Sequence, residues 1–112
     1  PIVMLPITTD EVSCIIKVCS INNIAIVPQG GNTSLCGANI PHSDNKQLEI
    51  VINTSKMDKI IETDIHNQSM IVESGCILSN IQDCAIENNL FFPLSLSAEG
   101  SCQIGGNIST NA

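Results

Sequence analysis

The stretch Ile24-Ala25-Ile26-Val27-Pro28-Gln29-Gly30-Gly31-Asn32-Thr33 decides the fold, because it runs from a short apolar segment directly into a pair of glycines. Four apolar residues closed by a proline predict a buried β-strand. Adjacent glycines let backbone N–H groups turn toward a ligand, and successive N–H groups in such turns form a concave site for anions. Ligands of open α/β sheets bind at the carboxyl ends of strands, where this loop begins. The sequence therefore predicts a strand followed by an anion-binding loop, with a diphosphate as its natural ligand.

An earlier strand and a helix are expected upstream of this loop. Residues 2–5 form another apolar run that a proline closes. Thr8 and Glu11 match a capping box, which predicts a helix that begins after Thr8. Apolar residues follow at helical spacing, and Ile15 and Ile16 are expected in the core. The first quarter of the chain is thus predicted to be a β-α-β unit with parallel strands.

The pattern changes downstream of the loop. Residues 48–53 form a third β-rich run, and residues 60–65 and 69–74 flank turn residues in a way that predicts an antiparallel hairpin. Apolar residues at helical spacing over 77–85 predict a second amphipathic helix. The switch from parallel to hairpin signals falls at 55–59, where a subdomain junction is expected.

A second glycine-rich stretch, residues 100–112, follows this helix, and it reads Gly-Ser-Cys-Gln-Ile-Gly-Gly-Asn-Ile-Ser-Thr-Asn-Ala. Neither residues 28–41 nor residues 94–112 contain a lysine or an arginine. A phosphate held by these two stretches must therefore rely on backbone N–H groups, hydroxyls and a helix N-terminus.

The charge balance excludes several function classes. The chain of 112 residues has a formal net charge of −7, and its only permanent cations are four lysines. Such a surface repels nucleic acid and anionic membranes, so no nucleic-acid partner is expected. No apolar run approaches the roughly 18 residues that a membrane-spanning helix needs, so no transmembrane segment is expected.

The cysteines and histidines offer no catalytic or metal site. The six cysteines form no Cys-x-x-Cys pair, and none lies at zinc-site spacing from a histidine, so reduced thiols are expected. His42 and His66 stand in polar, turn-like surroundings, and Glu99 is an isolated carboxylate before the second glycine stretch. No metal ligand and no catalytic residue is therefore predicted.

Motifs along the whole chain resemble those of one flavoprotein family. Pro-Gln-Gly-Gly-Asn-Thr at 28–33, Phe-Phe-Pro-Leu-Ser at 91–95, Glu-Gly-Ser-Cys at 99–102 and Ile-Gly-Gly-Asn-Ile-Ser-Thr-Asn-Ala at 104–112 occur in the family's order. The chain resembles the FAD-linked oxidases with a PCMH-type FAD-binding domain. More narrowly, it is similar to the branch of D-2-hydroxyglutarate dehydrogenase, D-lactate dehydrogenase (cytochrome) and the FAD subunit of glycolate oxidase.

The resemblance implies an α+β fold. A small parallel β-α-β subdomain over residues 1–55 would carry the pyrophosphate loop. Residues 56–112 would begin an antiparallel subdomain, with FAD bound between the two. Residues 1–112 would then be the N-terminal portion of a PCMH-type domain and a fragment of a longer protein.

The resemblance also implies the residues that bind FAD. Pro28 would fix the entry to the loop and Gly37 would complete its turn. The pyrophosphate would be lined by Gly30, Gly31, Asn32, Thr33, Ser34 and Leu35. The flavin side of the cofactor would be held by Gly100, Ser101, Ile104, Gly105, Gly106, Asn107, Thr110 and Asn111.

Two departures from the family pattern refine this expectation. Asn32 stands where berberine-bridge-type relatives carry a histidine that bonds covalently to the flavin, so non-covalent FAD is predicted. Ser34 and Ala38 replace glycines of the family pattern. Each adds a Cβ, at about 1 kcal/mol if the backbone there is left-handed, although serine offers a hydroxyl to phosphate in return.

The implied reaction is oxidation of a D-2-hydroxy acid to the 2-oxo acid by hydride transfer to FAD. A cap domain outside this chain would bind the substrate, and a quinone, a cytochrome or an electron-transfer flavoprotein would accept the electrons. The location would be the bacterial cytoplasm or the mitochondrion. The alternatives are another PCMH-type flavin oxidoreductase and a non-catalytic nucleotide-binding remnant.

Overall fold

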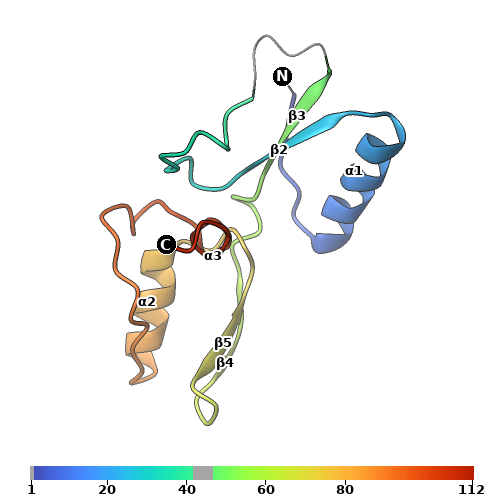
Figure 1. The fold of residues 1–112 in the computed structure, drawn as a ribbon. Coiled ribbons are helices and arrows are strands. Elements are labelled where there is room, and N and C mark those ends of the chain that lie inside the picture. Colours follow the sequence, from blue (N-terminus) through green and yellow to red (C-terminus); the bar gives the residue numbers. More distant parts are fainter. Residues whose placement is uncertain (1, 42–46) are drawn as a thin grey trace.

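The computed structural model describes residues 2–41 and 47–112 and has an α+β fold (Figure 1). His42 and its predicted loop role lie outside the described residues. The elements in chain order are β1 (Ile2–Met4), α1 (Thr9–Ile21), β2 (Ala25–Gln29), β3 (Glu49–Asn53), β4 (Ile60–Asp64), β5 (Ser69–Val72), α2 (Leu78–Glu87) and α3 (Ile104–Ser109).

The first three strands form a parallel sheet in the order β1-β3-β2. The predicted parallel strands β1 and β2 are not neighbours, because both pair with β3, which is mostly buried. Helix α1 packs on this sheet through Ile15 and Cys19, which join a cluster around Ile50 and Ile52. Ile16 was expected in the core but is 46% exposed, because α1 buries only one face.

Strand β2 does not end at Pro28, as the sequence pattern predicted, but continues to Gln29. Pro28 pairs in register with Ile52 of β3. A proline lacks the N–H that a central strand needs, but it is tolerated where one side of the strand has no partner. β2 is an edge strand, which explains why it can pass through Pro28 and deliver the chain to Gly30.

The second half of the chain pairs an antiparallel hairpin with a helix. Strands β4 and β5 are antiparallel, and α2 lies alongside them (Figure 1). Cys76, Ile81 and Ile104 form the buried cluster here, and Met70 and Phe92 pack against it. The predicted hairpin and second helix are confirmed. The division into subdomains 1–55 and 56–112 stays a prediction.

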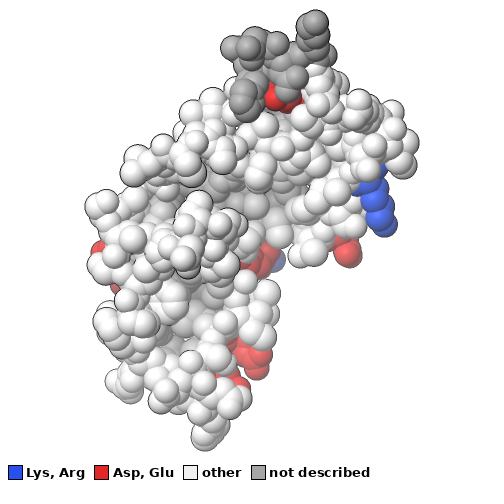
Figure 2. Space-filling model, in the orientation of Figure 1, with Lys and Arg blue, Asp and Glu red and all other residues white. Residues whose placement is uncertain are grey.

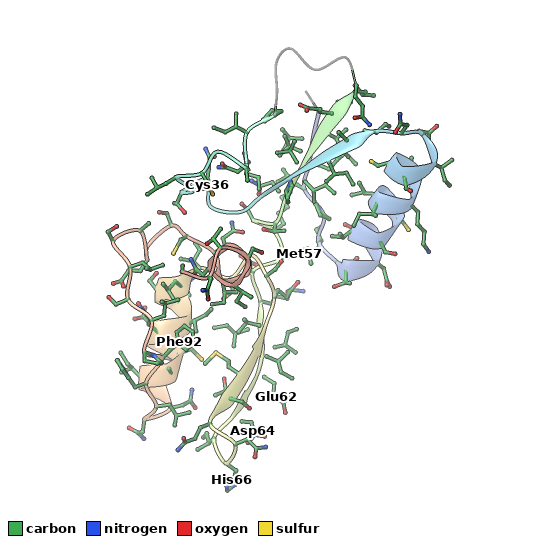
Figure 3. The ribbon with its side chains drawn as sticks, in the orientation of Figure 1. Cys36, Met57, Glu62, Asp64, His66 and Phe92 are labelled. Atoms are coloured by element: carbon green, nitrogen blue, oxygen red, sulfur yellow. The ribbon has the colours of Figure 1, made fainter. Side chains whose placement is uncertain are left out.

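The two hydrophobic clusters are separate from each other. The molecule measures 51 × 29 × 18 Å and has a radius of gyration of 15.7 Å. A compact chain of this length would have a radius of about 13 Å. The elongated shape is consistent with the two separate clusters, and Figure 3 places Met57 between the parallel sheet and the β4–β5 hairpin.

Candidate functional site

A cleft of about 520 Å³ lies between the first glycine loop and the C-terminal part of the chain. In Figure 1 the loop after β2 faces the segment that leads into α3. The loop contributes one wall, and residues 96–98 together with α3 contribute the other. The lining residues are Gly30, Gly31, Asn32, Thr33, Ser34, Leu35, Cys36, Asn39, Leu96, Ser97, Ala98, Cys102, Gln103, Gly106, Asn107, Thr110 and Ala112.

The two glycine motifs touch directly at Gly31. A Cβ at Gly31 would overlap the carbonyl oxygen of Ser101, so no other residue fits there without a shift of backbone. Gln103 adds a polar link: its Oε1 accepts a hydrogen bond of 2.6 Å from Thr54 Oγ1, and its Nε2 donates to Ser55 Oγ at 3.1 Å. Gln103 is buried, so these bonds hold one wall of the cleft to the end of β3.

The first loop presents unused backbone donors to the cleft. The N–H groups of residues 31–35 make no hydrogen bond within the described part of the chain. Asn32 has a left-handed backbone with φ of 59°, and Gly37 has φ of 75°. Gly30 and Gly31 bring the backbone itself to the surface of the cleft. Free N–H groups on a turning backbone are the feature that binds anions such as phosphates.

A chain of amide side chains fixes this loop to the sheet. Asn53 Nδ2 donates to Gln29 Oε1 at 2.8 Å, and Gln29 Nε2 donates to the carbonyl of Asn39 at 3.2 Å. Asn39 Nδ2 in turn donates to Asn32 Oδ1. The loop is therefore tied to the carboxyl ends of β2 and β3 at its beginning and near its end.

The second motif forms a helix that the sequence analysis did not predict. The N–H of Ile104 donates to the Cys76 carbonyl at 2.9 Å, and that of Gly105 donates to the Ser74 carbonyl at 2.9 Å. These bonds to the region after β5 hold a glycine pair in a helix that its low propensity would not favour. The N–H groups of Ile104 and Gly105 are thus engaged within the chain rather than open to a ligand.

The described lining of the cleft carries no charged side chain. Most of the surface seen in Figure 2 is likewise uncharged, and the few acidic and basic groups that it shows are scattered. The negative charge of a phosphate would therefore meet backbone N–H groups and hydroxyls rather than lysine. This matches the donors that the loop leaves free, so the residues present fit a diphosphate.

The structure brings many of the predicted site residues together and places others apart. Gly100 and Ser101 line a second hollow of about 390 Å³, which also reaches Gly30, Gly31 and Asn32. The predicted residues that line neither hollow are Pro28, Gly37, Ile104, Gly105 and Asn111. Contact of each predicted residue with FAD stays a prediction.

Two buried polar residues of the cleft, Asn39 and Gln103, were not predicted. Gln103 stands inside the second glycine motif, and a buried glutamine there could have been suspected as a link. Asn39 follows the loop, and no sequence pattern marked it as a site residue. Leu96, Ser97 and Ala98 were also missed, because an irregular segment has no period that reveals which side faces a ligand.

Two titratable groups near the cleft have shifted pKa values. A hydrogen bond with the Ser34 hydroxyl at 3.0 Å, helped by the backbone N–H of Ala38, lowers the pKa of the exposed Cys36 thiol. Hydrogen bonds from Gln82 and then Ser95 lower the pKa of Glu99. The Glu99 carboxylate is thus used to hold the segment before the second motif.

The described residues contain no group of three or more possible metal ligands. His66 lies at the exposed tip of the β4–β5 hairpin, away from the cleft (Figure 3). None of the described helices is long and apolar enough to cross a membrane.

Comparison with known proteins agrees with this site. The chain is 45% identical over 111 residues to a probable mitochondrial D-2-hydroxyglutarate dehydrogenase of Oryza sativa subsp. indica, in a match that covers 99% of this chain and 19% of the relative. It is 42% identical over 111 residues to the mitochondrial D-2-hydroxyglutarate dehydrogenase of Arabidopsis thaliana, with the same coverage of 99% and 19%. The chain therefore spans about a fifth of the length of these relatives.

A solved alkyldihydroxyacetonephosphate synthase has the same fold, with a TM-score of 0.89 and 19% sequence identity. The match covers 98% of this chain and 20% of that one. The family model described as "FAD binding domain" matches residues 1–112. The chain belongs to this FAD-binding domain family.

Proposed function

We propose that this chain binds FAD in the cleft and is the FAD-binding part of a dehydrogenase that oxidises a D-2-hydroxy acid to the 2-oxo acid. One observation carries the proposal: the N–H groups of residues 31–35 have no partner in the described chain and border an uncharged cleft. Membership of the FAD-binding domain family supports FAD as the ligand. The relatives named dehydrogenases support the reaction.

The residues of the cleft take distinct parts in this proposal. Gly30 and Gly31 let the loop pack against Gln103 and Ser101, and the free N–H groups after them would offset the charge of the diphosphate. Thr33 and Ser34 add hydroxyl donors from the same loop. Asn107 of α3 reaches the cleft from the opposite wall. When bound, the flavin would supply the acceptor for a hydride equivalent, and this chain would position the cofactor.

The FAD is proposed to be non-covalent. A covalent link needs a side-chain nucleophile, and the amide of Asn32 is not one. Asn32 also sits in a left-handed backbone with its side chain engaged by Asn39. This arrangement supports a role in shaping the loop.

The substrate class, the electron acceptor and the location rest on the relatives. D-2-hydroxyglutarate is the first substrate to test, because the relatives described above are named for it. A quinone, a cytochrome or an electron-transfer flavoprotein is the proposed acceptor. Both relatives are mitochondrial enzymes, which supports the mitochondrial option. No residue of this chain is proposed to be catalytic.

The test uses the full-length protein. Purified protein is expected to be yellow, to release free flavin into the supernatant after acid precipitation, and to lose its flavin absorbance when D-2-hydroxyglutarate is added without oxygen. L-2-hydroxyglutarate is the matched control and D-lactate tests the breadth of the site. A colourless protein that takes up no added FAD would overturn the proposal. Flavin retained in the acid precipitate would overturn only the non-covalent link.

A further inference from the structure

Asn39 is the most unusual polar residue of the cleft. Its side chain is only 7% exposed, and it lines the wall formed by the first glycine loop. Its Oδ1 atom is buried and accepts no hydrogen bond from the described part of the chain. A buried acceptor without a partner is destabilising, and native structures contain few of them. Such a group points to a partner that the free chain does not supply.

The orientation of Asn39 is fixed from two sides. Its Nδ2 donates one of its two hydrogens to Asn32 Oδ1, and this bond fixes which way the amide faces. Its carbonyl oxygen is held by Gln29 Nε2 at 3.2 Å. With both neighbours in place, Oδ1 is the buried polar atom of the side chain that is left without a partner in the described part of the chain. Because residues 32–36 are exposed, a small movement of this loop can open access to it.

The chemistry of this oxygen selects the kind of group it can meet. An amide oxygen accepts hydrogen bonds and donates none, so a phosphate oxygen beside it would be repelled. The hydroxyls of a sugar or ribityl chain and the N–H groups of a base or flavin ring are suitable donors.

We propose that Asn39 is a cofactor-binding residue whose Oδ1 accepts a hydrogen bond from a hydroxyl or N–H group of the bound dinucleotide, and not from its diphosphate. The proposal rests on FAD binding in this cleft. It assigns the neighbourhood of Asn39 to a sugar or ring portion of the cofactor, while the diphosphate lies at the N–H groups of residues 31–35.

The experiment compares the full-length protein with the variants Asn39→Leu and Asn88→Ala. Leucine resembles asparagine in shape but has no polar atoms. Asn88 is the matched control, because its Nδ2 donates to the Cys84 carbonyl at 2.8 Å at the end of α2, outside the residues that line the cleft. The FAD dissociation constant is measured by flavin fluorescence, and the melting temperature of the cofactor-free protein by circular dichroism. Inorganic pyrophosphate and ADP are used as competitors.

Asn39→Leu is expected to raise the FAD dissociation constant about tenfold or more, as loss of a buried hydrogen bond does. Leucine removes the unpartnered acceptor and also the Nδ2 bond to Asn32 Oδ1, and these two changes have opposite effects on stability. The melting temperature of the cofactor-free variant should therefore change little. A residue with a purely structural role would lower it clearly. Competition by pyrophosphate should be unaffected, whereas Asn88→Ala should lower the melting temperature and leave FAD affinity unchanged.

Competition by ADP shows which half of FAD carries the donor, and either result supports the proposal. Weaker ADP competition assigns the donor to the adenosine half, and unchanged ADP competition assigns it to the ribityl-flavin half. Wild-type FAD affinity in Asn39→Leu would overturn the inference and leave the proposed function intact. An equal loss of affinity for pyrophosphate would also overturn it, since Asn39 would then act on the diphosphate. A wild-type protein that binds no FAD would instead overturn the proposed function itself, and this inference with it.

Discussion

The two glycine motifs have similar compositions but different structures. The first motif is an exposed loop whose N–H groups at residues 31–35 have no partner in the described chain. The second is a short helix, α3, whose first N–H groups are bound by carbonyls of residues 74 and 76. In the first motif the N–H groups at residues 31–35 stay free, although Gly31 itself packs closely against the Ser101 carbonyl. Gly105 of the second lets a helix approach its neighbour closely, while Gly106 leaves open space at the cleft.

This difference shows that a glycine pair does not by itself indicate a phosphate-binding backbone. What decides is whether the N–H groups are already used within the chain. In the second motif the N–H groups of Ile104 and Gly105 are used, and the residues of this motif that line the cleft include Gly106, Asn107 and Thr110.

The largest effect is expected from Gly31→Ala, which breaks the contact between the two motifs. The new Cβ would overlap the Ser101 carbonyl, so the walls of the cleft must move apart. Overpacking of this kind destabilises by about 1–3 kcal/mol, and FAD affinity should fall by about a hundredfold. Gly100→Ala is the control for the free energy of unfolding, because a Cβ there meets no atom within 4 Å. Chemical denaturation and flavin fluorescence would measure the two effects. A Gly31→Ala variant with the stability and FAD affinity of wild type would show that the motifs do not touch.

The next largest effect is a difference in stability between alanine variants of the two glycines of α3. A Cβ at Gly105 would lie 2.9 Å from the Ser74 carbonyl oxygen, so Gly105→Ala should destabilise the chain by about 1–3 kcal/mol. A Cβ at Gly106 meets nothing within 4 Å, and alanine in a helix is favoured over glycine by about 1 kcal/mol. Gly106→Ala should therefore leave the melting temperature unchanged or raise it. Equal losses in both variants would contradict the assigned difference in packing.

The helices and strands differ in how well they could be predicted from the sequence. The capped helix, the parallel strands, the hairpin and the second helix each follow from local periodicity and capping residues, and all are confirmed. The helix at Ile104–Ser109 could not be predicted, because it depends on hydrogen bonds to the region after β5. Asn39 and Gln103 join the cleft for the same reason: their burial arises from tertiary contacts that no local pattern encodes.

A smaller effect is expected in the chemical labelling of Cys36, which tests whether the first loop is accessible to solvent. Its hydrogen bond with Ser34 lowers the pKa of the thiol, so the reactive thiolate forms at lower pH than it does for an ordinary thiol. Iodoacetamide should reach half of its maximal rate at Cys36 at a correspondingly lower pH, and Ser34→Ala should shift that midpoint upward. Bound FAD should slow labelling of Cys36 but not of Cys14, which is exposed on α1. Mass spectrometry would follow both sites, and equal protection of the two would contradict binding at this loop.

The smallest effect concerns the segment that leads to the second motif. Hydrogen bonds from Gln82 and Ser95 lower the pKa of Glu99 in the folded chain. Stability from the charged form is therefore present above the unfolded pKa and is lost as the pH falls through the lower folded pKa. Glu99→Gln keeps an acceptor but removes the charge, so it should melt slightly below wild type at neutral pH. The two melting curves should coincide in acid, and a difference that persists there would rule out this role for the charge.

The long-range contacts of the cleft also determine when during folding the site can exist. Thr54 and Gln103 are 49 positions apart in the chain, and the hairpin and α2 must fold between them before they meet. Contacts of such separation form late, because the entropy of closing the loop opposes them. FAD would then bind only the folded chain and stabilise it by mass action. When FAD is scarce, we expect the amount of protein that survives proteolysis to fall first, before any change in the properties of the molecules that remain.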